Sequence, residues 1–150
     1  MEKKQDAARR QYAALPYRKG PDGVEVMLVT SRETRRWIIP KGWPLKRRKP
    51  HAAAEREAYE EAGVVGEIAK QAIGSYSYDK RLKVGAAVTC QVDVFPLEVR
   101  KQLKKWPEQA QRDGRWFKPD EAARAVQEPE LGDLIRRVRE LVDKPAPTGA

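Results

Sequence analysis

Residues 42–64, GWPLKRRKPHAAAEREAYEEAGV, decide how this chain folds. The second half of the stretch is acidic, and Glu57 precedes Glu60 by three residues and Glu61 by four. Residues three and four apart share one face of a helix, so these spacings place the three carboxylates within one turn of each other. Like charges in that arrangement repel, which favours a cationic partner. Magnesium binds oxygen ligands, often one or two carboxylates together with substrate phosphates. The stretch therefore predicts a divalent metal site with these three glutamates as ligands.

The residues around the glutamates predict a strand, a loop and a helix, in that order. The apolar run 37–39 is typical of a short buried strand, and it leads into Pro40-Lys41-Gly42. Pro50 suits the first turn of a helix, since its missing N–H would have no partner there. Gly63 suits the residue after a helix, where a left-handed backbone ends it. We therefore expect a helix over 50–62.

Strand and helix patterns alternate along the chain and indicate a layered domain of the α/β or α+β class. Gly20-Pro21-Asp22-Gly23 is a turn signal between two β-prone runs, so a hairpin is expected there. We expect further strands and helices as follows: strands over 11–18, 24–30, 65–78, 83–97 and 114–117, and helices over 119–126 and 131–142. The expected organisation is a flexible basic arm over 1–10, a single domain over 11–142 and a disordered tail over 143–150.

The composition favours acidic partners. The chain has 150 residues, a formal net charge of +9 and a sequence pI of about 9.8. This excess of positive charge favours binding to nucleic acid, anionic membranes or phosphorylated small molecules. Cys90 is the only cysteine, so no disulfide can form within the chain, which suits a reducing cytoplasm. The polar N-terminus is unlike a secretory signal, and no apolar run reaches the roughly 18 residues that span a bilayer. We therefore expect a cytoplasmic protein with no membrane partner.

The spacing in residues 42–64 resembles the Nudix box, the motif of hydrolases that act on nucleoside diphosphates linked to another group. The matching residues are Gly42, Arg56, Glu57, Ala58, Glu60, Glu61, Gly63 and Val64. One position departs, since Arg48 stands where the family has its first glutamate, which mostly braces the loop against the helix. The resemblance implies the Nudix α/β/α sandwich, a mixed β-sheet between helices, and a hydrolase dependent on Mg²⁺ or Mn²⁺. It implies that Glu57, Glu60 and Glu61 bind the metal and that Arg56 pairs with them and holds them in register.

Two further segments, 30–42 and 106–122, look like those of the diphosphoinositol polyphosphate phosphohydrolases and the related diadenosine polyphosphate hydrolases. This resemblance implies cleavage of a pyrophosphate bond in a polyphosphorylated small molecule. The substrate-binding residues that it implies are Arg9, Arg10, Ser31, Arg32, Lys41, Gly42, Arg81 and Arg115, with Arg112 as the alternative to Arg115. Arginine suits this role because its planar guanidinium binds phosphate oxygens in pairs. Glu128 stands where these families carry a lysine, so diadenosine polyphosphates are expected ahead of diphosphoinositol polyphosphates.

Three other interpretations stay open. A nucleotide-pool sanitising pyrophosphatase would need a base pocket, which the sequence does not display clearly. An RNA-binding or regulatory Nudix module without catalysis would suit the net charge and Arg48. A module without catalysis would not need all three glutamates. Few aromatic residues are present to stack bases, so nucleic acid is the less favoured partner. The third interpretation is a solvated helix face on which Arg56 pairs with Glu60 and no metal binds. The sequence does not indicate the oligomeric state or the general base.

Overall fold

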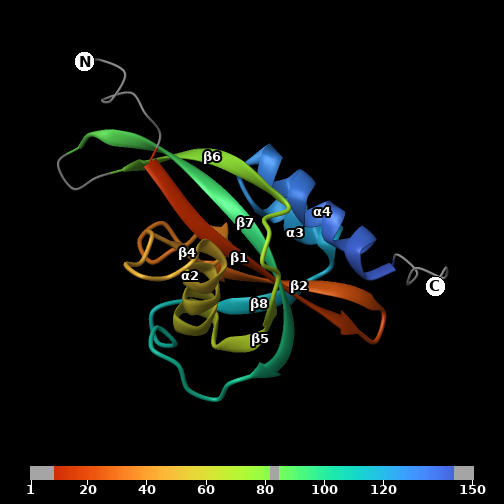
Figure 1. Cartoon of the computed structure of the whole chain (residues 1–150). Coiled ribbons are helices and arrows are strands. Elements are labelled where there is room, and N and C mark those ends of the chain that lie inside the picture. Colours follow the sequence, from red (N-terminus) through yellow and green to blue (C-terminus); the bar gives the residue numbers. More distant parts are fainter. Residues whose placement is uncertain (1–8, 82–84, 144–150) are drawn as a thin grey trace.

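The protein folds as one twisted mixed sheet with helices on both of its faces (Figure 1). The computed structural model describes residues 9–81 and 85–143. The strands are β1 (Arg9–Gly20), β2 (Gly23–Thr30), β3 (Trp37–Ile38), β4 (Lys41–Gly42), β5 (Val64–Ile68), β6 (Gly74–Arg81), β7 (Ala87–Gln102) and β8 (Gly114–Phe117). The helices are α2 (Pro50–Glu57), the π-helical turn η1 (Ala58–Ala62), α3 (Pro119–Ala125) and α4 (Pro129–Asp143). Among these residues, no helix is both long enough and apolar enough to cross a bilayer.

The first two strands form the expected hairpin. β1 and β2 are antiparallel, with Tyr17 opposite Val26 and Gly20 opposite Gly23. Gly23 has a φ angle of 119°, a conformation that glycine adopts without steric cost because it has no Cβ atom. The glycine-rich turn therefore sets the register of the first half of the sheet.

The longest strand, β7, makes the sheet mixed. It runs parallel to β1, with Cys90 opposite Arg9, and antiparallel to β5 and β6. Its side chains at Cys90, Val92 and Val94 are fully buried on one face, and Phe95 and Leu97 are buried on the other, so this part of β7 is covered on both sides.

The core lies on both faces of the sheet. Ala13 and Leu15 of β1 pack with α3 and α4, whereas Ala14 packs with α2 and η1, because successive residues of a strand point to opposite faces. Small residues at Ala54 and Ala58 let the acidic helix lie close to the sheet. The result is the expected α/β/α sandwich.

Several boundaries differ from the sequence prediction. β1 begins at Arg9, so Arg9 and Arg10 belong to the sheet and not to a flexible arm. Of the predicted arm and tail, residues 1–8 and 144–150 lie outside the described residues, and α4 extends to Asp143. The prediction missed this start because β1 is held there by its ladder with β7, a distant segment.

The middle of the chain also differs from the prediction. The strand expected over 65–78 is two strands, β5 and β6, which pair with different parts of β7. β7 continues to Gln102 and not to residue 97, because β5 pairs with it as far as Gln102. β4 was not expected, and it forms by pairing with Tyr12 and Ala13 of β1. In each case the boundary depends on a backbone partner, which a local pattern does not reveal.

Candidate active site

The acidic helix ends in a π-helical turn, η1, which is wider than an α-helical turn and is covered by Trp106. The N–H group of Gly63 donates to the carbonyls of Tyr59, four residues earlier, and of Ala58, five residues earlier, the latter as in a π-helix. Such turns occur often at functional sites. Gly63 has a φ angle of 67° and ends the helix, as predicted. A Cβ atom on Gly63 would lie closer to the Trp106 ring than the 3.0 Å that real Cβ atoms keep. Trp106 therefore covers the end of the turn that carries Glu60 and Glu61.

Glu57 lies at the end of α2 with its carboxylate against Gly42. A Cβ atom on Gly42 would approach the carboxylate carbon and both oxygens of Glu57 to less than 3.0 Å. Gly42 is itself held in β4 by its pairing with Tyr12 of β1. The absence of a side chain at Gly42 thus creates the space that the Glu57 carboxylate occupies.

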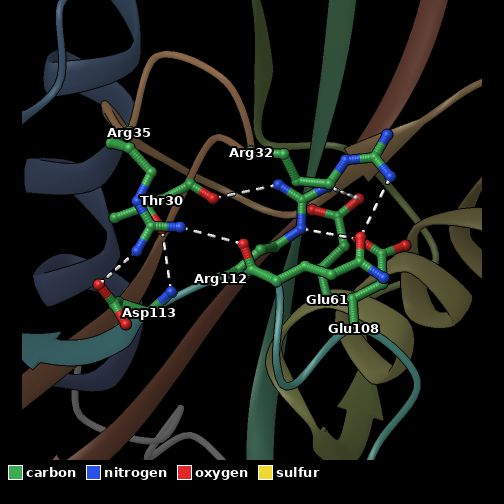
Figure 2. Close-up of polar contacts among 8 residues, drawn as sticks. Thr30, Arg32, Arg35, Glu61, Glu108, Arg112 and Asp113 are labelled. Carbon is green, nitrogen blue, oxygen red and sulfur yellow. Dashed lines mark hydrogen bonds and ion pairs between the residues drawn. The ribbon is translucent and has the colours of Figure 1, made fainter.

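Glu61 is buried, with 5% of its surface exposed. Its Oε2 atom lies 3.8 Å from Nη2 of Arg112, whose side chain is only 8% exposed. Arg112 also donates to Oε1 of Glu108 at 2.8 Å and to the carbonyl oxygen of Thr30 at 3.1 Å. Figure 2 shows the guanidinium group between these acceptors. Arg112 therefore links the acidic helix to β2 and to the segment that precedes β8.

The second oxygen of Glu61, Oε1, is buried and accepts no hydrogen bond from the described residues. Burial raises the pKa of Glu61 to about 8, while Arg112 opposes this increase and Glu57 adds to it. Burial also raises the pKa of Glu57, whereas the adjacent Glu61 carboxyl lowers it and the charges of Glu60 and Glu108 raise it. A buried carboxylate oxygen without a partner, next to a second carboxylate, costs free energy that a bound cation would offset.

Lys41 brings a positive charge to the same place. Burial lowers the pKa of its ammonium group to about 8, whereas the charges of Glu61 and Glu128 raise it. The Nζ atom lies 4.9 Å from the centroid of the Tyr78 ring. Lys41 thus stands near the buried Glu61 carboxylate, and its role as a substrate ligand stays a prediction.

Glu60 has a different neighbour. Its Oε2 atom pairs with Nε of Arg56 at 2.7 Å, the pairing predicted for Arg56. Within residues 9–81 and 85–143, no three carboxylate, imidazole or thiol groups converge on one point. Magnesium usually takes one or two protein carboxylates together with substrate phosphates and water. Glu57 and Glu61, with the unpaired oxygen of Glu61, fit that donor set, and Glu60 could join them only by leaving Arg56.

The connection between β2 and β3 contains Ser31 and Arg32. The Ser31 hydroxyl lies 2.6 Å from Oγ1 of Thr34 and accepts from the backbone N–H of Arg36 at 3.0 Å, so it stabilises its own turn. Arg32 is exposed and donates to Oε1 of Gln111 at 3.3 Å. Arg32 belongs to the polar contacts drawn in Figure 2, which it joins through Gln111. Its role as a phosphate ligand stays a prediction.

Four other predicted substrate ligands make no ion pair with the three glutamates among the described residues; they are Arg9, Arg10, Arg81 and Arg115. Arg10 pairs with Asp93 at 2.7 Å. Arg115 lies over the rings of Phe117 and Trp37, 4.3 Å and 5.5 Å from their centroids. Arg9 and Arg81 are exposed at the ends of their strands. Arg48, at the position of the missing glutamate, is also exposed.

Two functional positions were missed or given a different role. Arg112 was predicted only as an alternative phosphate ligand, yet it is the buried partner of Glu61. Glu108 brings a fourth carboxylate to the site, and its backbone N–H donates to the carbonyl of Glu60 at 2.9 Å. Both residues belong to the segment from Trp106 to Arg112. Sequence spacing alone does not predict that this segment folds back onto the acidic helix.

The chain is similar to known proteins of one family. The model of the NUDIX domain matches residues 7–138. The chain is 33% identical over 149 residues to "Nudix hydrolase 18, mitochondrial" of Arabidopsis thaliana, covering 91% of this chain and 82% of that protein. It is 30% identical over 121 residues to diphosphoinositol polyphosphate phosphohydrolase 3-alpha of Mus musculus, covering 79% of this chain and 70% of that protein.

A solved structure has the same fold. The Ap4A hydrolase of C. elegans superposes with a TM-score of 0.64 at 18% identity, covering 91% of this chain and 99% of that chain. This likeness confirms the fold class, while the family match and the curated relatives confirm the predicted resemblance. The chain belongs to the NUDIX domain family and is a Nudix-type pyrophosphohydrolase.

Proposed function

We propose that the protein hydrolyses a pyrophosphate bond of a polyphosphorylated small molecule and needs a divalent cation, Mg²⁺ or Mn²⁺. The observation that carries the proposal is the buried Glu61, whose Oε1 atom has no hydrogen-bond partner among the described residues and whose neighbour Glu57 lies against Gly42. Glu57 and Glu61 would hold the ion. When bound, such an ion supplies charge neutralisation for the pyrophosphate and activates water.

The other residues of the site have roles that follow from their contacts. Arg112 keeps Glu61 in place and is itself fixed by Thr30 and Glu108. Arg56 keeps Glu60 on the exposed side of the helix. Lys41 supplies positive charge near Glu61. Arg32, which contacts Gln111, would bind phosphate oxygens, because arginine donates two parallel hydrogen bonds. The protein thus orients phosphate groups against a pair of carboxylates.

Diadenosine polyphosphates are the favoured substrates and diphosphoinositol polyphosphates the second choice. Support comes from the net charge of +9, from Glu128 in place of a lysine, and from relatives named for both substrate classes. Hydrolysis of oxidised nucleoside triphosphates and a non-catalytic RNA-binding role are the alternatives. The cytoplasm stays the predicted location, although some plant relatives are named as mitochondrial.

A substrate panel tests this function. We would measure kcat/KM in Mg²⁺ at low and moderate salt for diadenosine tetraphosphate, a diphosphoinositol polyphosphate, nucleoside triphosphates, capped RNA and ADP-ribose. The polyphosphorylated compounds should rank first, and their kcat/KM should fall with salt because exposed charges are screened over about 8–10 Å. A higher kcat/KM for ADP-ribose at both salt concentrations would contradict the polyphosphate assignment.

The contact between Gly42 and Glu57 gives a separate prediction. In Gly42→Ala the new methyl group meets the flexible end of Glu57, so the side chain can rotate away and the fold should stay intact. We expect Tm to fall by less than about 4 °C. Displacing a ligand by an ångström can cost on the order of 10²-fold, so kcat/KM should fall at least ~10-fold.

Gly114→Ala is the matched control, because a Cβ atom at Gly114 would meet nothing closer than 3.4 Å. It should keep nearly the full kcat/KM. Equal losses of activity in the two variants would show that the contact with Glu57 has no special role.

A further inference from the structure

Residues 102–112, the capping segment, lead from the end of β7 towards β8 and lie along the acidic turn η1. A helix leaves the carbonyl groups of its last turn without partners inside the helix, so these groups need donors from elsewhere. The side-chain amide of Gln102 donates to the carbonyls of Ala62 and Gly63 at 3.1 and 3.0 Å. The backbone N–H of Leu103 also donates to the carbonyl of Gly63, at 2.8 Å. The capping segment therefore supplies the donors that the end of η1 lacks.

Both ends of the capping segment are fixed to the sheet. At its start, Gln102 is paired with Val64 of β5. At its end, Arg112 donates to the carbonyl of Thr30 at 3.1 Å, and the next residue, Asp113, accepts from the backbone N–H of Thr30 at 2.9 Å. Because both ends are fixed, the capping segment holds η1 in one place relative to the sheet.

Between these ends the capping segment contacts η1 twice more. The backbone N–H of Glu108 donates to the carbonyl of Glu60 at 2.9 Å. The Trp106 ring lies over Gly63, where a Cβ atom would come within 3.0 Å of three ring atoms. The indole thus packs directly on the backbone that follows Glu61 by two residues.

Two buried side-chain atoms of the described residues lack a hydrogen-bond partner, and both lie here: Oε1 of Glu61 and Nε1 of Trp106. An unpaired buried N–H group costs about 1–3 kcal/mol. A phenylalanine ring would cover part of the same backbone without that cost. The stability of the fold therefore does not account for a tryptophan at this position, which suggests that the indole serves the site.

The two candidate metal ligands depend on different neighbours. Glu57 lies at the end of α2 against Gly42 of β4, whereas Glu61 lies on η1 beneath the capping segment. Turns with π-helical winding are rare, so this one needs support from outside the helix. Ligands of a metal must be held within roughly 0.5 Å of the productive geometry. A shift of η1 would move Glu61 and leave Glu57 in place.

We propose that Trp106 is a positioning residue, which packs on Gly63 and thereby sets the distance between the Glu57 and Glu61 carboxylates for one divalent cation. It acts through these glutamates and contacts neither the cation nor the substrate. The inference rests on the proposed function, because that function assigns the cation to Glu57 and Glu61. It adds that the affinity for the cation depends on a side chain outside the acidic helix.

The test measures Mn²⁺ binding, from the EPR signal of free Mn²⁺, in protein from which bound metal and chelator have been removed. No substrate is present, so turnover does not enter. We expect Trp106→Phe to raise the Kd for Mn²⁺ at least ~10-fold, as is typical when a residue that orients a metal ligand is changed. Its Tm without metal should fall by less than about 4 °C, because the lost ring contacts are partly offset by removal of the unpaired N–H.

Trp37→Phe is the matched control. Trp37 is half-buried like Trp106, but it packs on the other face of the sheet, with the core beneath α3 and α4. Its Tm should fall by a similar amount, and its Kd for Mn²⁺ should stay within about twofold of the wild-type value, since sites that share no partner act independently.

Gln102→Met is a second variant, which decides the test if Trp106→Phe does not fold. Gln102 is exposed, so the fold should survive, while both donors to the end of η1 are lost. We expect its Kd for Mn²⁺ to rise about tenfold. A folded Trp106→Phe whose Kd equals that of the wild type would overturn the inference and leave the proposed function standing, as would an equal rise in Trp37→Phe. A wild type that binds no Mn²⁺ would contradict the proposed function, and the inference with it.

Discussion

Replacing Glu61 with Gln is expected to reduce kcat/KM for diadenosine tetraphosphate at least ~100-fold, which corresponds to about 2.7 kcal/mol of activation free energy. The substitution keeps the size of the side chain and removes the negative charge that a divalent cation needs as a ligand. Stability should change little, because Oε1 of Glu61 already lacks a hydrogen-bond partner among the described residues. The measurement is steady-state kinetics in saturating Mg²⁺, together with thermal unfolding.

Glu55→Gln is the control for this variant. Glu55 lies on the same helix with its side chain exposed, so the same chemical change there should leave kcat/KM within about threefold. If Glu61→Gln kept more than a tenth of the wild-type kcat/KM, the role of Glu61 as a metal ligand would be wrong.

The second large effect is expected at Arg112. Arg112→Met retains most of the side-chain volume but removes the donors to Glu108 and to the carbonyl of Thr30. Leaving these partly buried acceptors without the buried guanidinium should lower the free energy of unfolding by about 3 kcal/mol. For a chain of this size that corresponds to a decrease of about 6–12 °C in Tm.

Activity should fall as well, because Glu61 loses the neighbour at 3.8 Å that keeps it in place. Arg112→Lys keeps the charge without the planar fork of donors and should be intermediate in both Tm and kcat/KM. The control is Arg124→Met on α3, where the arginine is exposed and the change should cost less than about 0.5 kcal/mol. Similar decreases in Tm for Arg112→Met and Arg124→Met would contradict the buried role of Arg112.

The sequence predicted the acidic helix and its two ends because local chemistry determines them. Pro50 begins α2, and Gly63 ends η1 with a positive φ angle, both as expected. The hairpin of β1 and β2 followed from a glycine-rich turn in the same way. These features need only a few neighbouring residues, so a single sequence reveals them.

Features that depend on distant partners were not predicted. β4 exists because residues 41–42 pair with β1, and the extension of β7 to Gln102 depends on β5. In the site, spacing predicted the shared helix face of the glutamates, but Glu60 is paired with Arg56 and Glu61 with Arg112. Arg112 lies 51 positions after Glu61 in the sequence, so helix periodicity cannot predict that the two side chains pair.

The measurement that tests the central claim most directly is the rate of diadenosine tetraphosphate hydrolysis as a function of Mg²⁺ concentration in chelator-treated protein. Products are separated by anion-exchange chromatography. Metal-assisted hydrolysis predicts no detectable product in excess EDTA and a saturable return of the full rate as Mg²⁺ is added, because the ion supplies several kcal/mol of transition-state stabilisation. A rate in EDTA within about tenfold of the rate in Mg²⁺, a difference of less than about 1.4 kcal/mol, would contradict the assignment of Glu57 and Glu61 as metal ligands.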